Sequence, residues 1–153
     1  MGVDPGLAST GWGVVEKTDN RIIHLAHGCI ETKSGGERTA RLLLICTELK
    51  VVVDEWKPEI CAVETLYFSR NVKSALPVAE ARGAVCVTLA SLGIGVREFT
   101  PNEIKKAVTG VANADKAQVQ ELVRIILGLT LVPHPDHAAD ALAGAICAAN
   151  NCM

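Results

Sequence analysis

The chain has 153 residues, 49% hydrophobic and 21% charged, a balance typical of globular proteins that excludes a disordered or fibrous chain. At roughly 100–200 residues per domain, we expect a single domain over residues 1–153. Because only 3% of the residues are aromatic, the core must be aliphatic, and a base-stacking surface of many rings is excluded. The net charge of −2 does not exclude nucleic acid as a partner, since active-site carboxylates offset lysines that face DNA.

The spacing of the cysteines and the hydropathy of the chain indicate in which cellular compartment the protein is expected. The six cysteines form no CxxC pair, and most lie within apolar runs, which favours buried free thiols over disulfides. No signal-peptide pattern opens the chain. The longest charge-free stretch, residues 83–96, is too short and too interrupted by Gly and Ser to span a membrane. We therefore expect a protein of the reducing cytoplasm, without a membrane segment.

Strands are predicted where short apolar or alternating runs end at turn residues. The Pro5-Gly6 pair closes the first run, and Thr18-Asp19-Asn20 between the next two predicts an antiparallel hairpin. His24 and His27 lie in that hairpin and are predicted to be strand surface residues. The predicted strand segments are residues 2–4, 11–16, 22–32, 60–63 and 96–99.

Helices are predicted where apolar residues recur at three- and four-residue spacing. The series Thr100-Pro101-Asn102-Glu103 has the pattern of a capping box with Pro at the first helical position. We expect Ser74 to be an N-cap, which would keep Pro77 in the first turn. The predicted helical segments are residues 42–56, 74–92, 101 onward, 119–126 and 136–149. Strands alternating with helices in this order predict an α/β fold with a mixed sheet.

Three acidic residues occupy places that a fold does not favour. Asp4 and Glu64 each end an apolar strand, and Asp140 lies in an Ala-rich helix. Strand ends in open α/β sheets converge on one crevice, and carboxylates gathered there repel unless a cation joins them. Two divalent ions about 3.5–4 Å apart would activate water and stabilise the leaving oxygen of a phosphodiester. The alternative is that each acid is a helix cap or a surface charge.

A series of motifs follows in order over nearly the whole chain: Gly2-Val3-Asp4-Pro5-Gly6, Thr10-Gly11-Trp12-Gly13, Val63-Glu64-Thr65-Leu66-Tyr67, residues 74–83, residues 104–110, residues 114–119 and residues 137–143. Together these motifs resemble the RuvC family of Holliday junction resolvases. One departure is that Met1 alone precedes the first motif, where family members carry several apolar residues; either the sequence begins late or the first strand is clipped.

The resemblance implies a ribonuclease-H-like fold with a five-stranded mixed sheet flanked by helices, and a homodimer that nicks two opposed strands of a four-way DNA junction. The family's catalytic and metal positions fall on Asp4, Glu64, His137 and Asp140. Many members carry Asp where this chain has His137, a variant also found in the family. The implied cofactors are two Mg²⁺ ions per site, with Mn²⁺ as an alternative, and the implied partner is a branch-migration helicase complex.

Four further residues are expected to contact DNA. Tyr67 falls where family members often carry an aromatic ring after the catalytic Glu, and such a ring can stack on an unpaired base. Phe68 competes for that role. Lys105 and Lys116 are candidates for phosphate contacts, and Lys116 would lie in the first turn of a helix, where the dipole disfavours a cation unless an anion binds.

Three other functions are weighed against the resolvase. An actin- or hexokinase-like ATP-binding lobe also places an Asp before a Gly-rich hairpin, as in residues 4–13, but that class needs two lobes. A junction-binding protein without cleavage does not need the acidic set. A ribonuclease-H-like nuclease that acts on RNA is disfavoured by the motifs around Lys116 and His137.

Asp136 is expected to be the N-cap of the last helix, and Trp12 and Trp56 are expected in the core.

Overall fold

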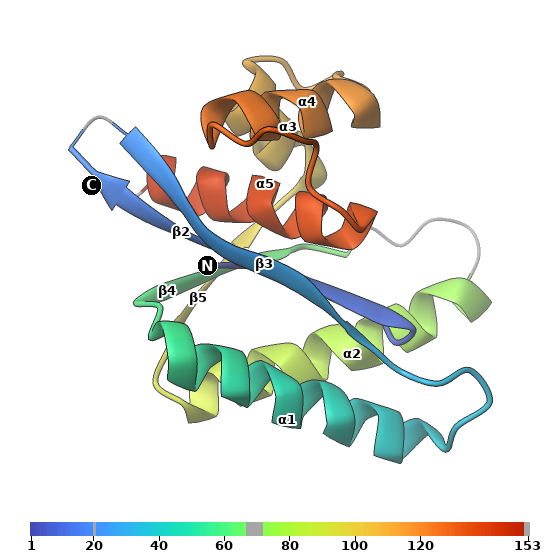
Figure 1. The fold of residues 1–153 in the computed structure, drawn as a ribbon. Helices are drawn as coiled ribbons and strands as arrows, with labels where there is room; N and C mark the ends of the chain where they lie inside the picture. Colours follow the sequence, from blue (N-terminus) through green and yellow to red (C-terminus); the bar gives the residue numbers. More distant parts are fainter. Residues whose placement is uncertain (20, 67–71, 152–153) are drawn as a thin grey trace.

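The computed structural model describes residues 1–19, 21–66 and 72–151 and forms an α/β fold with one mixed sheet (Figure 1). The sheet order is β3-β2-β1-β4-β5; β1 pairs antiparallel with β2 and parallel with β4. The elements are β1 (Gly2–Asp4), β2 (Ser9–Thr18), β3 (Arg21–Glu31), α1 (Arg38–Trp56), β4 (Ile60–Glu64), α2 (Val72–Ser91), β5 (Gly95–Phe99), α3 (Pro101–Thr109), α4 (Lys116–Ile126) and α5 (Asp136–Asn150). The predicted element order and five-stranded mixed sheet are confirmed.

Helices cover both faces of the sheet, as Figure 1 shows, with α1 and α2 on one side and α5 on the other. Two buried clusters fill these layers. The first lies against α1 and α2 and includes Ile45, Leu49 and Leu89. The second joins α5 to α3 and α4, with Val123 and Ile146 completely buried. This layering leaves the carboxyl ends of β1 and β4 open at one edge of the sheet.

Two helix starts differ from the sequence prediction. Helix α2 begins at Val72, so Ser74 lies inside the helix and is not its N-cap, and Pro77 lies beyond the first turn. Helix α5 begins at Asp136, with Pro135 as the N-cap residue and no side-chain cap. The capping box predicted for α3 is confirmed, since Thr100 and Glu103 exchange hydrogen bonds. Capping side chains thus fix the start of α3, whereas Ser74 does not cap α2 and Asp136 does not cap α5.

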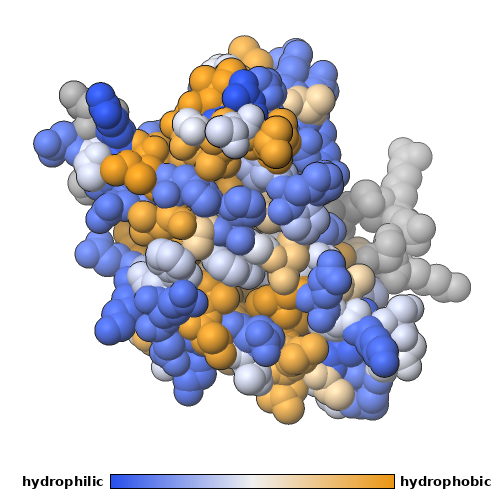
Figure 2. Space-filling view, in the orientation of Figure 1, coloured by the Kyte–Doolittle hydropathy of each residue, from blue (hydrophilic) through white to orange (hydrophobic). Residues whose placement is uncertain are grey.

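The face of the molecule shown in Figure 2 combines polar side chains with patches of apolar ones. Trp12 and Trp56 are partly buried and pack against the cluster under α1 and α2, as expected for core residues.

The five cysteines in the described part of the chain are free thiols. None of the described helices is long and apolar enough to cross a membrane. Exposed apolar residues lie on α1, α2 and α4, among them Leu43, Leu44, Val51, Leu76, Val87, Ile125 and Ile126.

Glycines let α5 pack directly on the central strands. A Cβ at Gly11 would collide with the backbone carbonyl of His137, and one at Gly2 would collide with that of Ala141. The absence of side chains at these two positions therefore sets the depth of α5 against the sheet. It also fixes the start of α5, which carries His137, beside the end of β1.

We expect Gly11→Ala to lower the free energy of unfolding by about 1–3 kcal/mol, because overpacking forces α5 away from the sheet. The same displacement moves His137 and should reduce any activity that depends on it. Gly83→Ala is the matched control: its methyl group meets no described atom within 4 Å, and Ala in a helix is favoured by about 0.5–1 kcal/mol. Urea unfolding of both variants measures the difference, and equal stabilities would contradict this packing.

Candidate active site

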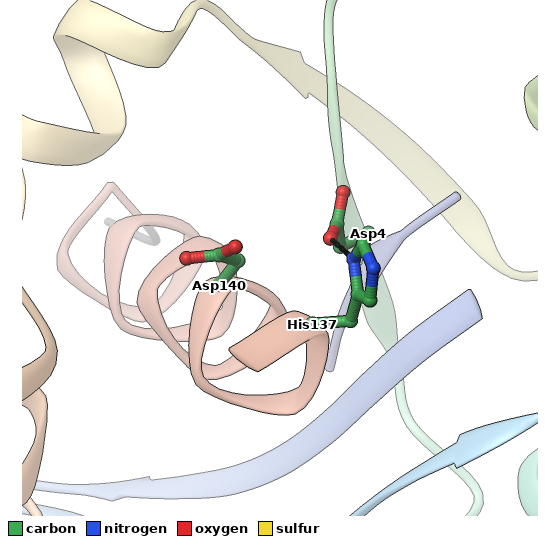
Figure 3. Close-up of side chains that lie close together, drawn as sticks. All are labelled: Asp4, His137 and Asp140. Atoms are coloured by element: carbon green, nitrogen blue, oxygen red, sulfur yellow. Dashed lines mark hydrogen bonds and ion pairs between the residues drawn. The ribbon is translucent and has the colours of Figure 1, made fainter. Parts of the chain in front are cut away.

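Four of the predicted site residues gather at the carboxyl edge of the sheet. Strands β1 and β4 are parallel neighbours with Val3 opposite Val63, so Asp4 and Glu64 end adjacent strands. Helix α5 crosses the sheet on one face and brings His137 and Asp140, one turn apart, to the same edge (Figure 3). The turn after Asp4 is fixed by buried Thr10, whose hydroxyl donates to the Gly6 carbonyl and accepts from the Gly6 N–H.

Asp4, His137 and Asp140 form the tightest group. One ligand atom from each lies within 4.8 Å of the others, and His137 Nδ1 is 2.7 Å from Asp4 Oδ2 (Figure 3). When the ring is neutral, an N–H at Nδ1 donates to the Asp4 carboxylate and leaves Nε2 with a lone pair. Two carboxylates and one imidazole within this distance fit a divalent cation, since oxygen donors suit hard ions and the ring adds a softer nitrogen.

Glu64 lies beside this group and contributes no atom to it. A cavity of about 280 Å³ is lined by Asp4, Glu64 and Arg82, and another of the same volume by Glu64, Lys105 and Asp140. Burial, followed by repulsion from Asp4 and Asp140, raises the pKa of Glu64 to about 7, against a smaller opposing effect of Lys105. The Glu64 carboxyl therefore holds its proton near neutral pH until a cation offsets the surrounding negative charge.

The raised pKa of Glu64 predicts that the free energy of unfolding of the metal-free protein depends on pH. Between pH 4.5 and pH 7 the folded state keeps a proton that the unfolded state has released, so stability falls as pH rises and stays lower above pH 7. Glu64→Gln resembles the neutral form at every pH. At pH values above 7 it should be more stable than wild type by about 1–3 kcal/mol, and below pH 4.5 it should equal wild type.

Chemical unfolding at both ends of this pH range, without divalent ions, checks the prediction. Glu48→Gln, on the exposed surface of α1, is the matched control and should change little. Equal stability of Glu64→Gln and wild type in alkaline buffer would contradict the assignment of a destabilising carboxylate to Glu64.

Lys116, predicted as a phosphate contact, lies against the acidic residues of α5. Its Nζ is 3.1 Å from Asp140 Oδ2 and 3.2 Å from Asp136 Oδ2. Burial opposes the charge of Lys116, but the hydrogen bonds that its ammonium group donates to Asp140 and Asp136 outweigh this effect and raise the lysine pKa. Asp136, expected as an N-cap, instead forms an ion pair with Lys116. The pKa of Asp140 is raised by burial, and Lys116 partly compensates.

Two features of the site were not anticipated from sequence. The guanidinium of Arg82 donates from Nε to the Glu64 carbonyl oxygen at 3.1 Å and pairs with Glu98 at 2.7 Å. The salt bridge of Asp136 to Lys116 joins residues on different helices, so no local spacing indicates it. Tyr67 and Phe68, predicted to contact DNA, lie outside the described residues.

Comparison with known proteins decides the family. Residues 1–148 match the family model of the crossover junction endodeoxyribonuclease RuvC. The chain belongs to the RuvC family. The RuvC of Treponema pallidum (strain Nichols) is 51% identical over 153 residues, which are 100% of this chain and 78% of that protein. The RuvC of Heliobacterium modesticaldum is 42% identical over 151 residues, or 99% of this chain and 93% of that protein.

Solved RuvC structures have the same fold. The structure of Thermus thermophilus RuvC in complex with a Holliday junction substrate has a TM-score of 0.89 and 35% sequence identity, and the match covers 95% of this chain and 89% of that one. The structure of Thermus thermophilus RuvC has a TM-score of 0.86 at the same identity. The ribonuclease-H-like fold expected from the sequence is thereby confirmed, and the chain is a nuclease of the crossover junction endodeoxyribonuclease class.

Proposed function

We propose that this chain is a Holliday junction resolvase that nicks two opposed strands of four-way DNA junctions in recombination and repair. The observation that carries the proposal is the group of Asp4, His137 and Asp140 beside Glu64 at the sheet edge. Membership of the RuvC family over residues 1–148 supports it. A non-cleaving junction binder has no need for this acidic set, and the ATP-binding class needs two lobes.

In this proposal Asp4, Glu64, His137 and Asp140 are the catalytic residues and hold two Mg²⁺ ions, or Mn²⁺. When bound, the ions would activate water and offset charge on the phosphodiester and its leaving oxygen. The chain's own residues orient the site. Asp4 accepts the N–H of His137 Nδ1 and so fixes the ring, whose Nε2 then either ligates a cation or accepts a proton from the attacking water.

Lys116 and Lys105 complete the proposed DNA-facing side. Lys116 has an exposed ammonium group anchored by Asp136 and Asp140, and Lys105 lines the cavity between Glu64 and Asp140. Both lysines are therefore next to the carboxylates where the scissile phosphate would bind. A cation at this place lowers the repulsion between the acidic site and the DNA backbone.

Lys116→Ala should weaken junction binding and reduce the slope of log K against log salt by about one, the value for one lost phosphate contact. Tyr67→Ala should reduce cleavage with little change in that slope, because stacking releases no counterions. Lys50→Ala, exposed on α1 on the opposite face of the sheet, is the matched control. Binding titrations in metal-free buffer at several salt concentrations measure the slopes, and a wild-type slope for Lys116→Ala would contradict the contact.

We further propose that the functional unit is a cytoplasmic homodimer working with a branch-migration helicase. One chain supplies one acidic group, and two opposed nicks in one junction require two such groups. Two copies related by a two-fold axis present their sites in the opposed arrangement that a four-way junction demands. Sedimentation with and without junction DNA tests the dimer, and a monomer bound to cleaved junction would contradict it.

The proposed activity is tested with three substrates: a mobile four-way DNA junction, a linear DNA duplex and an RNA hairpin. A resolvase nicks the junction in the presence of divalent ions and leaves the other two intact. Junction binding without nicks would favour a non-cleaving binder, and cleavage of the hairpin would favour a ribonuclease. Release of phosphate from ATP in the same buffer would favour the ATP-binding lobe.

A further inference from the structure

Two histidines lie together on edge strand β3, away from the acidic site. His24 Nε2 is 2.7 Å from His27 Nδ1, and the two rings meet edge to face with centroids 4.9 Å apart. Residues three apart on a regular strand point to opposite faces of the sheet. The contact between these rings therefore needs a local departure from regular pairing.

A β-bulge supplies that departure. Val14 pairs with Ala26, and the next residue, Val15, pairs with His24, so Leu25 is left over between the two pairs. The extra residue turns His24 to the same face as His27. On the neighbouring strand β2, His24 pairs with Val15 and His27 pairs with Gly13. That face is the one covered by α5, because a Cβ on Gly13 would contact Leu142. The bulge thus places two imidazoles side by side at the rim of the α5 layer.

Both rings are partly exposed and available as neutral ligands. Burial lowers the pKa of His24 and of His27, and repulsion from His27 lowers that of His24 further. Two adjacent imidazolium ions repel each other, so at most one ring is charged, and two neutral rings are joined by one N–H···N hydrogen bond. A metal ion can take the place of that bond when the donor ring changes tautomer and carries its proton on its other nitrogen, because both facing nitrogens then offer a lone pair.

We propose that His24 and His27 form a chelating site for a divalent transition-metal ion such as Zn²⁺, separate from the acidic group at the sheet edge. Imidazole suits borderline ions and is a poor ligand for Mg²⁺. Two nitrogens that each bind a tetrahedral ion at about 2.0–2.1 Å lie about 3.3 Å apart, so the rings need to separate by about 0.6 Å and to rotate until both lone pairs point at the ion. No third His, Cys, Asp or Glu of the described residues joins the pair, and water completes the coordination shell.

Calorimetric titration of the full chain with Zn²⁺ in a reducing, Mg²⁺-containing buffer tests this site. In His24→Gln and in His27→Gln, one Zn²⁺ equivalent should disappear or bind about 10²-fold more weakly or worse, since a chelate becomes a single-ligand site. The matched control is His134→Gln, an exposed histidine outside the pair, which should keep that equivalent. His137→Gln should also keep it, which separates the pair from the acidic group.

A second readout keeps the test independent of folding. His24→Gln and His27→Gln should nick DNA at the wild-type rate with Mg²⁺, and Zn²⁺ should shift the imidazole NMR resonances of both His24 and His27 in wild type. Wild-type Zn²⁺ stoichiometry and affinity in both variants would overturn the proposal. Unshifted His24 and His27 resonances at saturating Zn²⁺ would also overturn it.

Discussion

We expect Asp4→Asn and Glu64→Gln each to reduce strand nicking by about 10³-fold or more, while junction binding in metal-free buffer should survive. Losing metal stabilisation costs several kcal/mol of transition-state energy, and about 4 kcal/mol corresponds to that factor. The amides keep the size of the side chains but remove the charge that would offset the cations. Binding survives because neither carboxylate attracts the DNA backbone, and removing a negative charge lowers repulsion.

Single-turnover cleavage of a labelled four-way junction, paired with binding measured without divalent ions, gives both quantities. Glu48→Gln and Asp54→Asn make the same chemical changes on the exposed surface of α1, on the opposite face of the sheet from α5, and should cleave like wild type. Wild-type rates in Asp4→Asn or Glu64→Gln would remove these carboxylates from the mechanism. Loss of binding together with cleavage would assign them a structural role.

The second large effect concerns His137 and metal choice. Imidazole is a softer donor than carboxylate, and His in place of Asp removes one negative charge from the ligand set, so Mg²⁺ should be held less tightly than Mn²⁺. Wild type should therefore cleave better with Mn²⁺, and His137→Asp should shift the preference back toward Mg²⁺. Ligation needs a ring nitrogen that carries no proton, so protons compete with the metal ion and wild-type activity should fall in acidic buffer.

Metal titrations of wild type and His137→Asp separate two roles for this residue. A base that only orients or deprotonates water would give a similar loss of activity in acid, and for that reason the pH profile alone does not decide. The ratio of Mn²⁺-supported to Mg²⁺-supported cleavage does decide. The same ratio in both proteins would exclude His137 as a ligand and leave it as the base, oriented by Asp4 at 2.7 Å.

Much of the fold follows from local signals in the sequence. Apolar runs bounded by turn residues marked all five strands, and the capping pattern at Thr100 marked the start of α3. The start of α2 did not follow, because Ser74 and Pro77 have the pattern of a helix start but lie within the helix. Tertiary packing overrides such local preferences when they are worth only about 1 kcal/mol.

The site was predictable in its residues and less so in its contacts. Asp4 and Glu64 ended strands that the α/β order makes parallel neighbours, so their convergence followed from topology. The pairing of Lys116 with Asp136 and Asp140 did not follow, because α4 and α5 are separate helices whose packing no spacing reveals. The sequence did not predict the bulge at Leu25 either, and in a regular strand His24 and His27 would point to opposite faces of the sheet.

The most direct test of the account is to map the nicks that wild-type protein makes in a mobile four-way junction with each of its four strands labelled in turn. Two acidic groups in a two-fold symmetric dimer should nick two opposed strands at symmetrically related positions and leave ends that ligase seals without processing. Adding Asp4→Asn protein in excess should suppress these paired nicks through mixed dimers. Nicks scattered over all four strands, or equal cutting of linear duplex, would contradict the proposed function.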